Sequence, residues 1–151
     1  MQHQLVVTSD GSHTFYLSEL NEHYHSIHGA VQESKHVFIN AGLRKVIENN
    51  KNEINILEIG LGTGLNALLT FIELKNSLVK INYTAIEAFP LTIDVVDKLN
   101  YSELLNINSS NNILNKIHEE EWEQDIKLSS RFVLHKIKNT LQQAALKNNY
   151  N

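Results

Sequence analysis

A short run of glycines that follows an apolar segment constrains the fold of this 151-residue chain more than any other feature. Residues 54–59 are nearly all apolar, which is typical of a strand buried on both faces of a parallel sheet. Gly60, Gly62 and Gly64 come directly after it, and residues 65–74 have helical spacing. The pattern predicts a strand, a tight turn and a helix, with the turn able to approach a ligand closely.

The spacing of the glycines restricts the ligand that this turn can hold. A dinucleotide fingerprint would place its third glycine at Leu65, and a P-loop would need a Gly-Lys pair that the chain lacks. Two acids remain as candidate ligand contacts: Glu58 precedes the glycines, and Glu87 ends the next predicted strand, where a carboxylate can accept hydrogen bonds from both ribose hydroxyls. The alternative is structural: the glycines turn the chain, Glu58 bonds local backbone N–H groups, and Glu87 is solvated.

Strands and helices are predicted to alternate along the rest of the chain. Residues 31–49 have helical spacing, residues 81–87 and 131–138 are predicted strands, and Pro90 suits the first turn of a helix beginning near residue 91. Short helices are expected between residues 100 and 122, and helical spacing returns over 140–147. Residues 5–20 are expected to be short extended pieces around a turn at residues 10–12. This alternation predicts the α/β class, with a parallel sheet and flanking helices.

Composition excludes several kinds of protein. The length suits about one domain, and 42% apolar residues with a single proline indicate a globular chain. Cysteine is absent, so disulfides, thiolate metal sites and a cysteine nucleophile are excluded. The N-terminus has no basic region and only a very short apolar run, so neither a signal peptide nor a membrane anchor is expected, and the expected location is the cytoplasm. The net charge of −4 gives no indication for or against an RNA partner.

Two groups of residues resemble a known family. Glu58 with the segment Gly60-Leu61-Gly62-Thr63-Gly64 resembles the first motif of Rossmann-like methyltransferases, in which the turn wraps the methionine and ribose portion of S-adenosylmethionine. The more specific pattern comprises Asp10-Gly11-Ser12-His13-Thr14-Phe15-Tyr16, His23-Tyr24-His25-Ser26, Gly29-Ala30, Glu33-Ser34-Lys35-His36-Val37-Phe38 and the extension to Asn66-Ala67. Together these segments resemble the MnmC-type methyltransferase, which completes 5-methylaminomethyl-2-thiouridine at the tRNA wobble position, from about residue 8 to residue 141.

The resemblance implies a reaction and a set of contacts. A methyl group would pass from the sulfonium of S-adenosylmethionine to the exocyclic amine of a 5-aminomethyl uridine in tRNA. The cofactor-binding residues would be Tyr16, Glu58, Gly60, Leu61, Gly62, Thr63, Gly64, Asn66, Glu87 and Ala88. Candidates for closing the substrate pocket or stacking on the base are Tyr24, His25, Glu33 and His36.

Other interpretations of the same side chains remain open. Tyr16 can be an ordinary core aromatic, and Glu33 and His36 can form a surface pair on a helix. A metal site at His23, His25, His28 and His36 is conceivable, but no carboxylate or thiolate is spaced to complete it, so no metal is predicted.

The sequence also departs from the family pattern. The resemblance leads us to expect a fourth strand on the other side of the first, carrying an Asp-Ala-Phe-like motif, and no such motif occurs in the chain. No catalytic residue is therefore assigned. We expect residues 1–50 to form an N-terminal extension with the first helix, and residues 51–151 to form the first half of the cofactor-binding domain, with the C-terminal half of the sheet missing and the first strand left as an edge.

Three functions follow as hypotheses. The first is an S-adenosylmethionine-dependent tRNA methyltransferase, incomplete as this chain alone, whose substrate a separate oxidase could supply. The second is a non-catalytic S-adenosylmethionine-binding module. The third is a small-molecule methyltransferase, which would have the same glycine turn but no reason to carry the pattern over residues 23–38.

Overall fold

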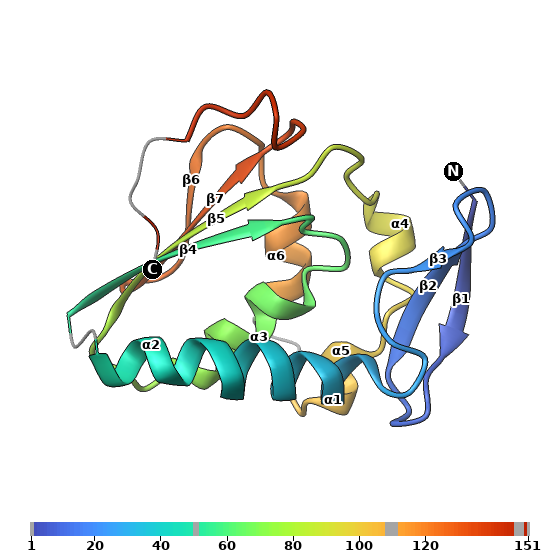
Figure 1. Cartoon of the computed structure of the whole chain (residues 1–151), viewed down its shortest axis with the longest axis horizontal. Helices are drawn as coiled ribbons and strands as arrows, with labels where there is room; N and C mark the ends of the chain where they lie inside the picture. The colour runs from blue at the N-terminus through green and yellow to red at the C-terminus, as the bar shows by residue number, and fades with distance from the viewer. Residues whose placement is uncertain (1, 50–51, 108–111, 147–149, 151) are drawn as a thin grey trace.

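A computed structural model describes residues 2–49, 52–107, 112–146 and 150 (Figure 1). The chain begins with a small antiparallel sheet of β1 (His3–Val7), β2 (His13–Leu17) and β3 (Glu22–His23), in that order. A continuous helical segment follows, formed by α1 (Ala30–Ser34), the π-helical η1 (Lys35–Leu43) and α2 (Arg44–Asn49). Figure 1 shows this segment running beneath the main sheet, with the small sheet at its amino end.

The main sheet has four strands in the order β4-β5-β7-β6. Its members are β4 (Glu53–Ile59), β5 (Lys80–Ile86), β6 (Asp125–Ser129) and β7 (Phe132–Ile137). β4, β5 and β7 are parallel. β6 precedes β7 in the chain, is joined to it by a tight turn and pairs with it antiparallel. The carboxyl ends of the parallel strands therefore meet at one edge of the sheet, next to the small N-terminal sheet (Figure 1).

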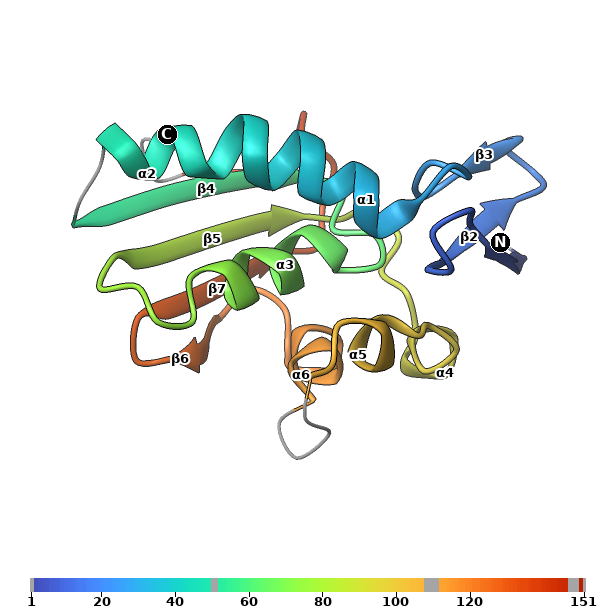
Figure 2. The same ribbon diagram turned by 90° about the horizontal axis from the view of Figure 1, so that it is seen from below.

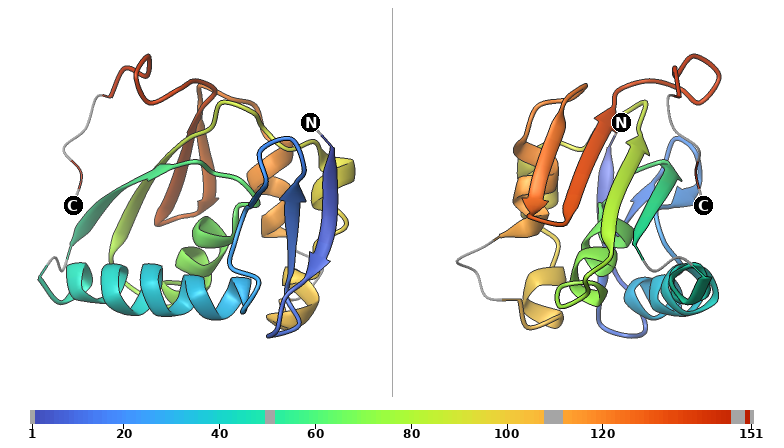
Figure 3. Two further views of the ribbon diagram at one scale, coloured as in Figure 1. Left: turned by 45° about the vertical axis from the view of Figure 1, so that its right-hand side comes forward. Right: turned by 90° about the vertical axis from the view of Figure 1, so that its left-hand side faces the viewer.

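Helices cover one face of this sheet. They include α3 (Leu65–Glu73), α4 (Ile93–Val96), α5 (Tyr101–Leu104) and α6 (Ile113–Glu119). Seen from below, α3 lies between the helical segment of residues 30–49 and α6 (Figure 2). The last described segment passes over the opposite face, as the two side views show (Figure 3). The layers agree with the α/β class expected from alternating strands and helices.

The core lies between the sheet and these helices. Leu65 and Leu68 of α3 face the sheet and are almost completely buried, together with Ile81 of β5 and Leu134 of β7. This burial explains the helical spacing of apolar residues after the glycine turn, because one face of α3 packs against the strands.

Most expected elements are confirmed, with shifts of one or two residues at their ends. The predicted strands at 54–59, 81–87 and 131–138 correspond to β4, β5 and β7, and the helices at 31–49 and 65–74 are present. The helix expected near residue 91 begins at Ile93, and the short helices expected between 100 and 122 are α5 and α6. Within the described residues β4 is an edge strand, as expected. The predicted domain boundary at residues 50 and 51 lies outside the described residues.

The helix predicted over 140–147 is wrong for its described part, residues 140–146. The N–H groups of Gln143 and Ala144 both bond to the carbonyl of Thr140, which makes a single turn that does not continue. Leu141 and Leu146 remain exposed, so the segment has no buried face to stabilise a helix. Isolated short helices are marginal without such packing.

Strand β6 was not anticipated. Its burial alternates, with Ile126 and Leu128 inside and their neighbours exposed, and it joins β7 through a two-residue connection. Both are signals of a hairpin. Among the described residues, no helix is both long and apolar enough to cross a membrane.

Candidate functional site

The glycine turn joins β4 to α3 at the carboxyl edge of the sheet. Gly60, Gly62 and Gly64 all have positive φ angles, of 83°, 52° and 75°. The N–H of Gly60 bonds to the carbonyl of Ile86 at 2.8 Å, which ties the turn to the end of β5. The N–H of Gly64 bonds to the carbonyl of Leu61 at 2.9 Å and closes the turn on itself.

The surroundings of the three glycines differ. A Cβ on Gly62 would lie 2.9 Å from the ring of Tyr24, and one on Gly64 would lie 2.9 Å from Nε2 of His118 in α6. Nothing lies within 4 Å of a Cβ on Gly60. Two glycines are thus needed for packing within the protein, and Gly60 is the one that has open space for a ligand.

Glu87 follows β5 and contacts the turn directly. Its Oε2 accepts a hydrogen bond from the N–H of Gly62 at 2.9 Å, and its Oε1 accepts one from the N–H of Phe89 at 2.8 Å. The side chain is half-buried, and so is that of Ala88, the next residue. The anion-attracting N–H of Gly62 is therefore already paired with a carboxylate of the protein itself.

Glu58 lies inside the protein, at the end of β4. Its Oε1 accepts from the amide of Asn66 and its Oε2 from the hydroxyl of Tyr83, both at 2.9 Å. Burial raises the pKa of Glu58 to about 7, against the two hydrogen bonds, which lower it. Oδ1 of Asn66 is buried and has no partner among the described residues. Glu58 thus bonds two side chains rather than the local backbone N–H groups considered from the sequence.

A cavity of about 380 Å³ opens between the turn and the helical segment below it. No lysine or arginine lines this cavity in the described part of the chain. Its walls come from the loop after β3, from η1, and from the turn with the ends of its neighbours: Tyr24, His25, Phe38, Glu58, Ile59, Gly60, Leu61, Gly62 and Asn66. We call it the turn cavity.

Tyr24 and His25 are the two predicted pocket residues that line the turn cavity. Nε2 of His25 lies 2.7 Å from Oγ1 of Thr63, and burial lowers the pKa of His25. The ring of Tyr24 packs on Gly62 and contacts the ring of Phe15 edge-on. The N-terminal extension therefore reaches the glycine turn through this loop.

The other predicted residues lie elsewhere. Glu33 is exposed, and its Oε2 accepts from the N–H of Ser26, so it supports the loop rather than lining the cavity. His36 lines a separate cavity between the α1–η1 segment and the end of α5. The hydroxyl of Tyr16 donates to Asn21, and its ring lies 4.8 Å from that of His23. The proposed roles of Glu33, His36 and Tyr16 stay predictions.

Three contacts at the turn were not anticipated. The hydroxyl of Tyr101 donates to Oγ1 of Thr63, Nε2 of His118 donates to the carbonyl of Thr63, and Phe38 lines the cavity. Burial lowers the pKa of His118 to about 4, so the ring is neutral near pH 7. Sequence pattern gives no signal for such pairs, because the partners are tens of residues apart.

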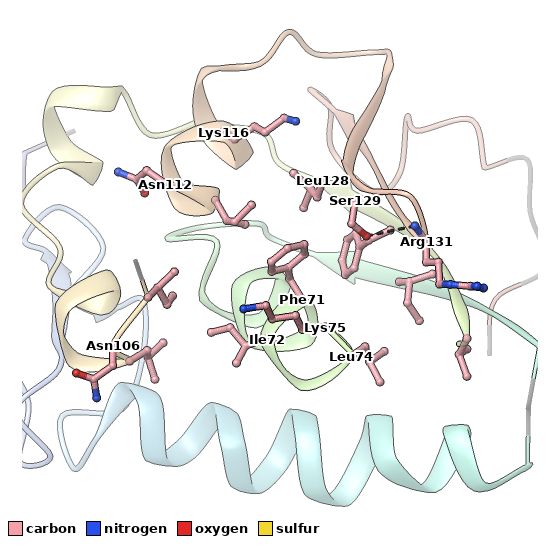
Figure 4. A pocket seen from close by; sticks show the side chains of 16 residues that line it. Phe71, Ile72, Leu74, Lys75, Asn106, Asn112, Lys116, Leu128, Ser129 and Arg131 are labelled. Atoms are coloured by element: carbon pink, nitrogen blue, oxygen red, sulfur yellow. Dashed lines mark hydrogen bonds between the residues drawn. The ribbon is translucent and has the colours of Figure 1, made fainter. Parts of the chain in front are cut away.

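A further cavity, of about 590 Å³, lies at the opposite end of the sheet, between α3 and α6 (Figure 4). Phe71, Ile81 and Phe132 form part of its wall, and Lys75 lies across it. None of the predicted site residues lines it. It lies at the amino ends of β5 and β7, whereas open parallel sheets bind ligands beyond the carboxyl ends of their strands. We therefore take the turn cavity as the candidate site. No cluster of potential metal ligands occurs among the described residues.

Comparison with known proteins gives a consistent result. The chain is similar to the tRNA 5-methylaminomethyl-2-thiouridine biosynthesis bifunctional protein MnmC from two Leptospira interrogans strains, of serovars copenhageni and Lai. The identity is 35% over an alignment of 97 residues, which covers 59% of this chain. The crystal structure of MNMC2 from Aquifex aeolicus superposes with a TM-score of 0.64 over 90% of this chain, at 23% identity. The chain is therefore similar in sequence to part of the MnmC proteins and in fold to MNMC2.

The extent of the MnmC matches is limited. The chain spans 15% of the length of the two Leptospira MnmC proteins and 42% of the MNMC2 chain. No protein-family model matches. The likeness to MNMC2 confirms the Rossmann-like α/β fold that the glycine turn predicts.

Proposed function

We propose that the turn cavity binds S-adenosylmethionine and that the chain forms the cofactor side of a methyltransferase acting on the aminomethyl group of a wobble uridine in tRNA. The observation that carries the proposal is the charge of the site. Glu87 bonds to the glycine turn, and no lysine or arginine lines the cavity in the described residues. Glu58 lines the cavity with a carboxyl whose pKa burial raises to about 7, so a cationic ligand beside it would favour its ionised form. A methyltransferase cofactor with a sulfonium group brings a positive charge to such a site.

Electrostatics separates this ligand from nucleotides bound through phosphates. Helix N-termini and glycine turns ordinarily attract anions through their free N–H groups. Here the N–H of Gly62 is paired with Glu87, and the approach of a phosphate to that carboxylate would be repelled. A ribose instead gains from the same carboxylate, because its two hydroxyls are donors.

The residues at the turn suit the parts of the cofactor. Gly60, with open space around it, allows the ligand to approach the backbone. Glu87 does not itself line the turn cavity but bonds to Gly62 in its wall, and from there it would hold the ribose. When bound, the cofactor supplies an activated methyl group on a sulfonium. The protein would contribute position and exclusion of water, since in-line transfer to a neutral amine gains most from the alignment of the reacting atoms.

Tyr24 and His25 would close the acceptor side. They line the turn cavity from the N-terminal extension, which carries the more specific part of the family pattern. The lowered pKa of His25 keeps its ring neutral, so it would not repel a cationic cofactor. The names of the Leptospira relatives, which refer to tRNA and to 5-methylaminomethyl-2-thiouridine, favour a tRNA substrate over a free small molecule. With tRNA as substrate, we infer a cytoplasmic location, and a separate oxidase could provide the free amine.

A non-catalytic S-adenosylmethionine-binding module is the second candidate. The described residues that line the turn cavity offer contacts to a cofactor, and no catalytic role is assigned among them. Cofactor binding is common to both candidates, whereas methyl transfer to tRNA distinguishes them.

The test is calorimetry of the chain with S-adenosylmethionine and S-adenosylhomocysteine, followed by transfer of a labelled methyl group to hypomodified tRNA. We expect both adenosyl compounds to bind, and Glu87→Gln to weaken binding about tenfold or more, because a hydrogen bond to a charged group is lost. ATP and NAD are the matched controls. Tighter binding of either control than of S-adenosylhomocysteine would contradict the proposal.

A further inference from the structure

Thr63 lies in the middle of the glycine turn, and its side chain is 1% exposed. Its hydroxyl oxygen is 2.7 Å from Nε2 of His25 and 3.3 Å from the hydroxyl of Tyr101. Its carbonyl accepts a hydrogen bond of 3.1 Å from Nε2 of His118. One residue of the turn is thus fixed by three separate segments: the loop after β3, α5 and α6.

The hydrogen bonds at the hydroxyl of Thr63 have a defined direction. Tyr101 donates to Oγ1 of Thr63, so the hydroxyl proton of Thr63 is available to His25. We assign Nε2 of His25 as the acceptor of that proton, which requires a neutral ring with its proton on Nδ1. The lowered pKa of His25 agrees with this assignment. In this assignment the hydroxyl of Tyr101 donates to Thr63, and the hydroxyl of Thr63 donates to His25.

His118 is itself held in place from the strand side. Lys136 of β7 is completely buried, and its Nζ donates to the carbonyls of His118 and Glu120 at the end of α6. The ammonium also lies 4.7 Å from the centre of the Trp122 ring. The position of α6, and with it the contact of His118 with Thr63, is therefore fixed by the sheet.

The rest of the turn is held by backbone hydrogen bonds of Gly60 and Gly64 and by the bond of Gly62 to Glu87, but its glycines have no side chains that could add further contacts. Glycine populates positive φ about as readily as negative φ, so a segment with three glycines has many accessible conformations. Leu61 anchors the turn through apolar contacts in the core. Thr63 adds the side-chain hydrogen bonds that, together with these backbone bonds, favour the conformation in which the N–H of Gly62 meets Glu87.

We propose that Thr63 is a positioning residue for cofactor binding. Its hydroxyl holds the glycine turn in the binding conformation and connects it to the His25 loop, without itself having to touch the ligand. This inference rests on the proposed function, because the ligand concerned is the adenosyl cofactor. It assigns the loop at Tyr24 and His25 a second task, which is to stabilise the turn.

The experiment compares three variants of the whole chain. Thr63→Val keeps the shape of the side chain and removes the hydroxyl, and Thr63→Ser keeps the hydroxyl. Thr70→Val is the matched control, because Thr70 is also completely buried and its hydroxyl also makes a hydrogen bond that valine would remove. That bond, of 2.7 Å, goes to the carbonyl of Asn66 within α3 and not to residues 60–64. Affinity for S-adenosylhomocysteine is measured by calorimetry. We expect Thr63→Val to bind at least tenfold more weakly, and Thr63→Ser and Thr70→Val to stay within about threefold of the wild type.

Hydrogen exchange provides a second measurement that needs no ligand. The N–H groups of Gly62 and Gly64 should exchange about tenfold faster in Thr63→Val, relative to the N–H of Ile56 in the same protein, and should not do so in Thr70→Val. Unchanged exchange at both glycines, or equal loss of affinity in Thr63→Val and Thr70→Val, would overturn the inference. Failure of the wild type to bind the adenosyl compounds would overturn the proposed function instead, and the exchange rates would still decide the role of Thr63.

Discussion

The two acids at the site lie in different surroundings. Glu87 is half-buried and accepts from backbone N–H groups of the turn and of the segment after β5. Glu58 is buried and accepts from Asn66 and Tyr83. A buried carboxyl whose two oxygens both accept from neutral donors is expected to hold its proton to a higher pH than usual, because the donors only partly replace the lost solvation. Its ionisation is therefore linked to the stability of the fold.

Glu58→Gln should remove a pH dependence of stability. The pKa of Glu58 is raised from 4.5 to about 7 in the folded protein, so between these values the folded state holds a proton that the unfolded state has released. This proton makes the free energy of unfolding fall as pH rises from 4.5 to about 7. One pKa unit corresponds to roughly 1.4 kcal/mol, so the change amounts to a few kcal/mol at most. Urea unfolding at several pH values measures it.

The histidines at the turn act in the opposite sense. The pKa of His118 is lowered from 6.5 to about 4, so its contribution makes stability rise with pH over that range. The dependence of the wild-type free energy of unfolding on pH therefore contains both effects. The difference between the wild type and Glu58→Gln at each pH gives the contribution of the Glu58 carboxyl alone. Glu53→Gln, at the exposed start of the same strand, controls for the change in net charge. Parallel profiles for wild type and Glu58→Gln would contradict the assignment.

At the level of elements, the glycine turn is a junction between β4, α3 and α6. Gly64 allows His118 and Ile117 of α6 to approach the start of α3, whereas Gly60 faces open space. The same residue type therefore serves packing at one position and ligand access at another. Sequence pattern cannot separate these two uses, because the helix that contacts Gly64 comes more than 45 residues later.

The glycine pair Gly60 and Gly64 gives a matched test of this division. Gly64→Ala would place a Cβ 2.9 Å from His118 and 3.3 Å from Ile117, at a φ of 75°, so we expect it to displace α6 and lower the free energy of unfolding by about 2 kcal/mol or more. Gly60→Ala carries the positive-φ strain alone, about 1 kcal/mol, but should weaken binding of S-adenosylhomocysteine. Denaturant unfolding and calorimetry measure the two effects. An equal loss of stability in both variants would show that backbone strain, and not the clash with α6, explains the loss in Gly64→Ala.

Most elements were predictable because their signals are local. The apolar run of β4, the glycines after it and the helical spacing of α3 lie within about 20 residues and depend on neighbours in the chain. The helix predicted over 140–147 does not form in its described part, because helical spacing alone does not stabilise a helix without a surface to pack on. Leu141 stays exposed there. At the site, the places of the glycines and Glu87 at the strand ends could be predicted from sequence pattern. The contacts of Tyr101 and His118 with Thr63 could not, because they depend on the tertiary fold.

For the whole molecule, the connection between the two sheets decides whether the N-terminal extension can reach the site. Asp10, in the turn between β1 and β2, provides much of that connection. Its carboxylate accepts from the N–H and hydroxyl of Ser12, from the hydroxyl of Thr8, and from the N–H of Gln32 in α1. The hydroxyl of Ser12 is also within 3.2 Å of the N–H groups of Ala30 and Val31. The small sheet is thus bonded to the start of the helical segment that underlies the main sheet.

Asp10→Asn should loosen this connection. Burial disfavours the charged form of Asp10, but the hydrogen bonds from Ser12, Gln32 and Thr8 outweigh it and lower the pKa from 3.8 to about 2. The carboxylate therefore contributes stability that is present above pH 3.8 and is lost as pH falls through about 2. An amide removes one acceptor oxygen, so we expect a loss of about 1–3 kcal/mol at pH 7 and a flatter acid profile between pH 4 and 2 than that of the wild type.

Limited proteolysis locates the effect of Asp10→Asn within the molecule. Because the small sheet and the loop that carries Tyr24 and His25 are attached at Asp10, cleavage within residues 2–28 should precede cleavage of the main sheet in the variant and not in the wild type. Asp94→Asn, on the exposed side of α4, removes the same charge and should change stability by less than about 0.5 kcal/mol. If the N-terminal residues stay as resistant in Asp10→Asn as in Asp94→Asn, the small sheet must be held chiefly by its apolar contacts, such as those of Phe15, and the connection at Asp10 would be secondary.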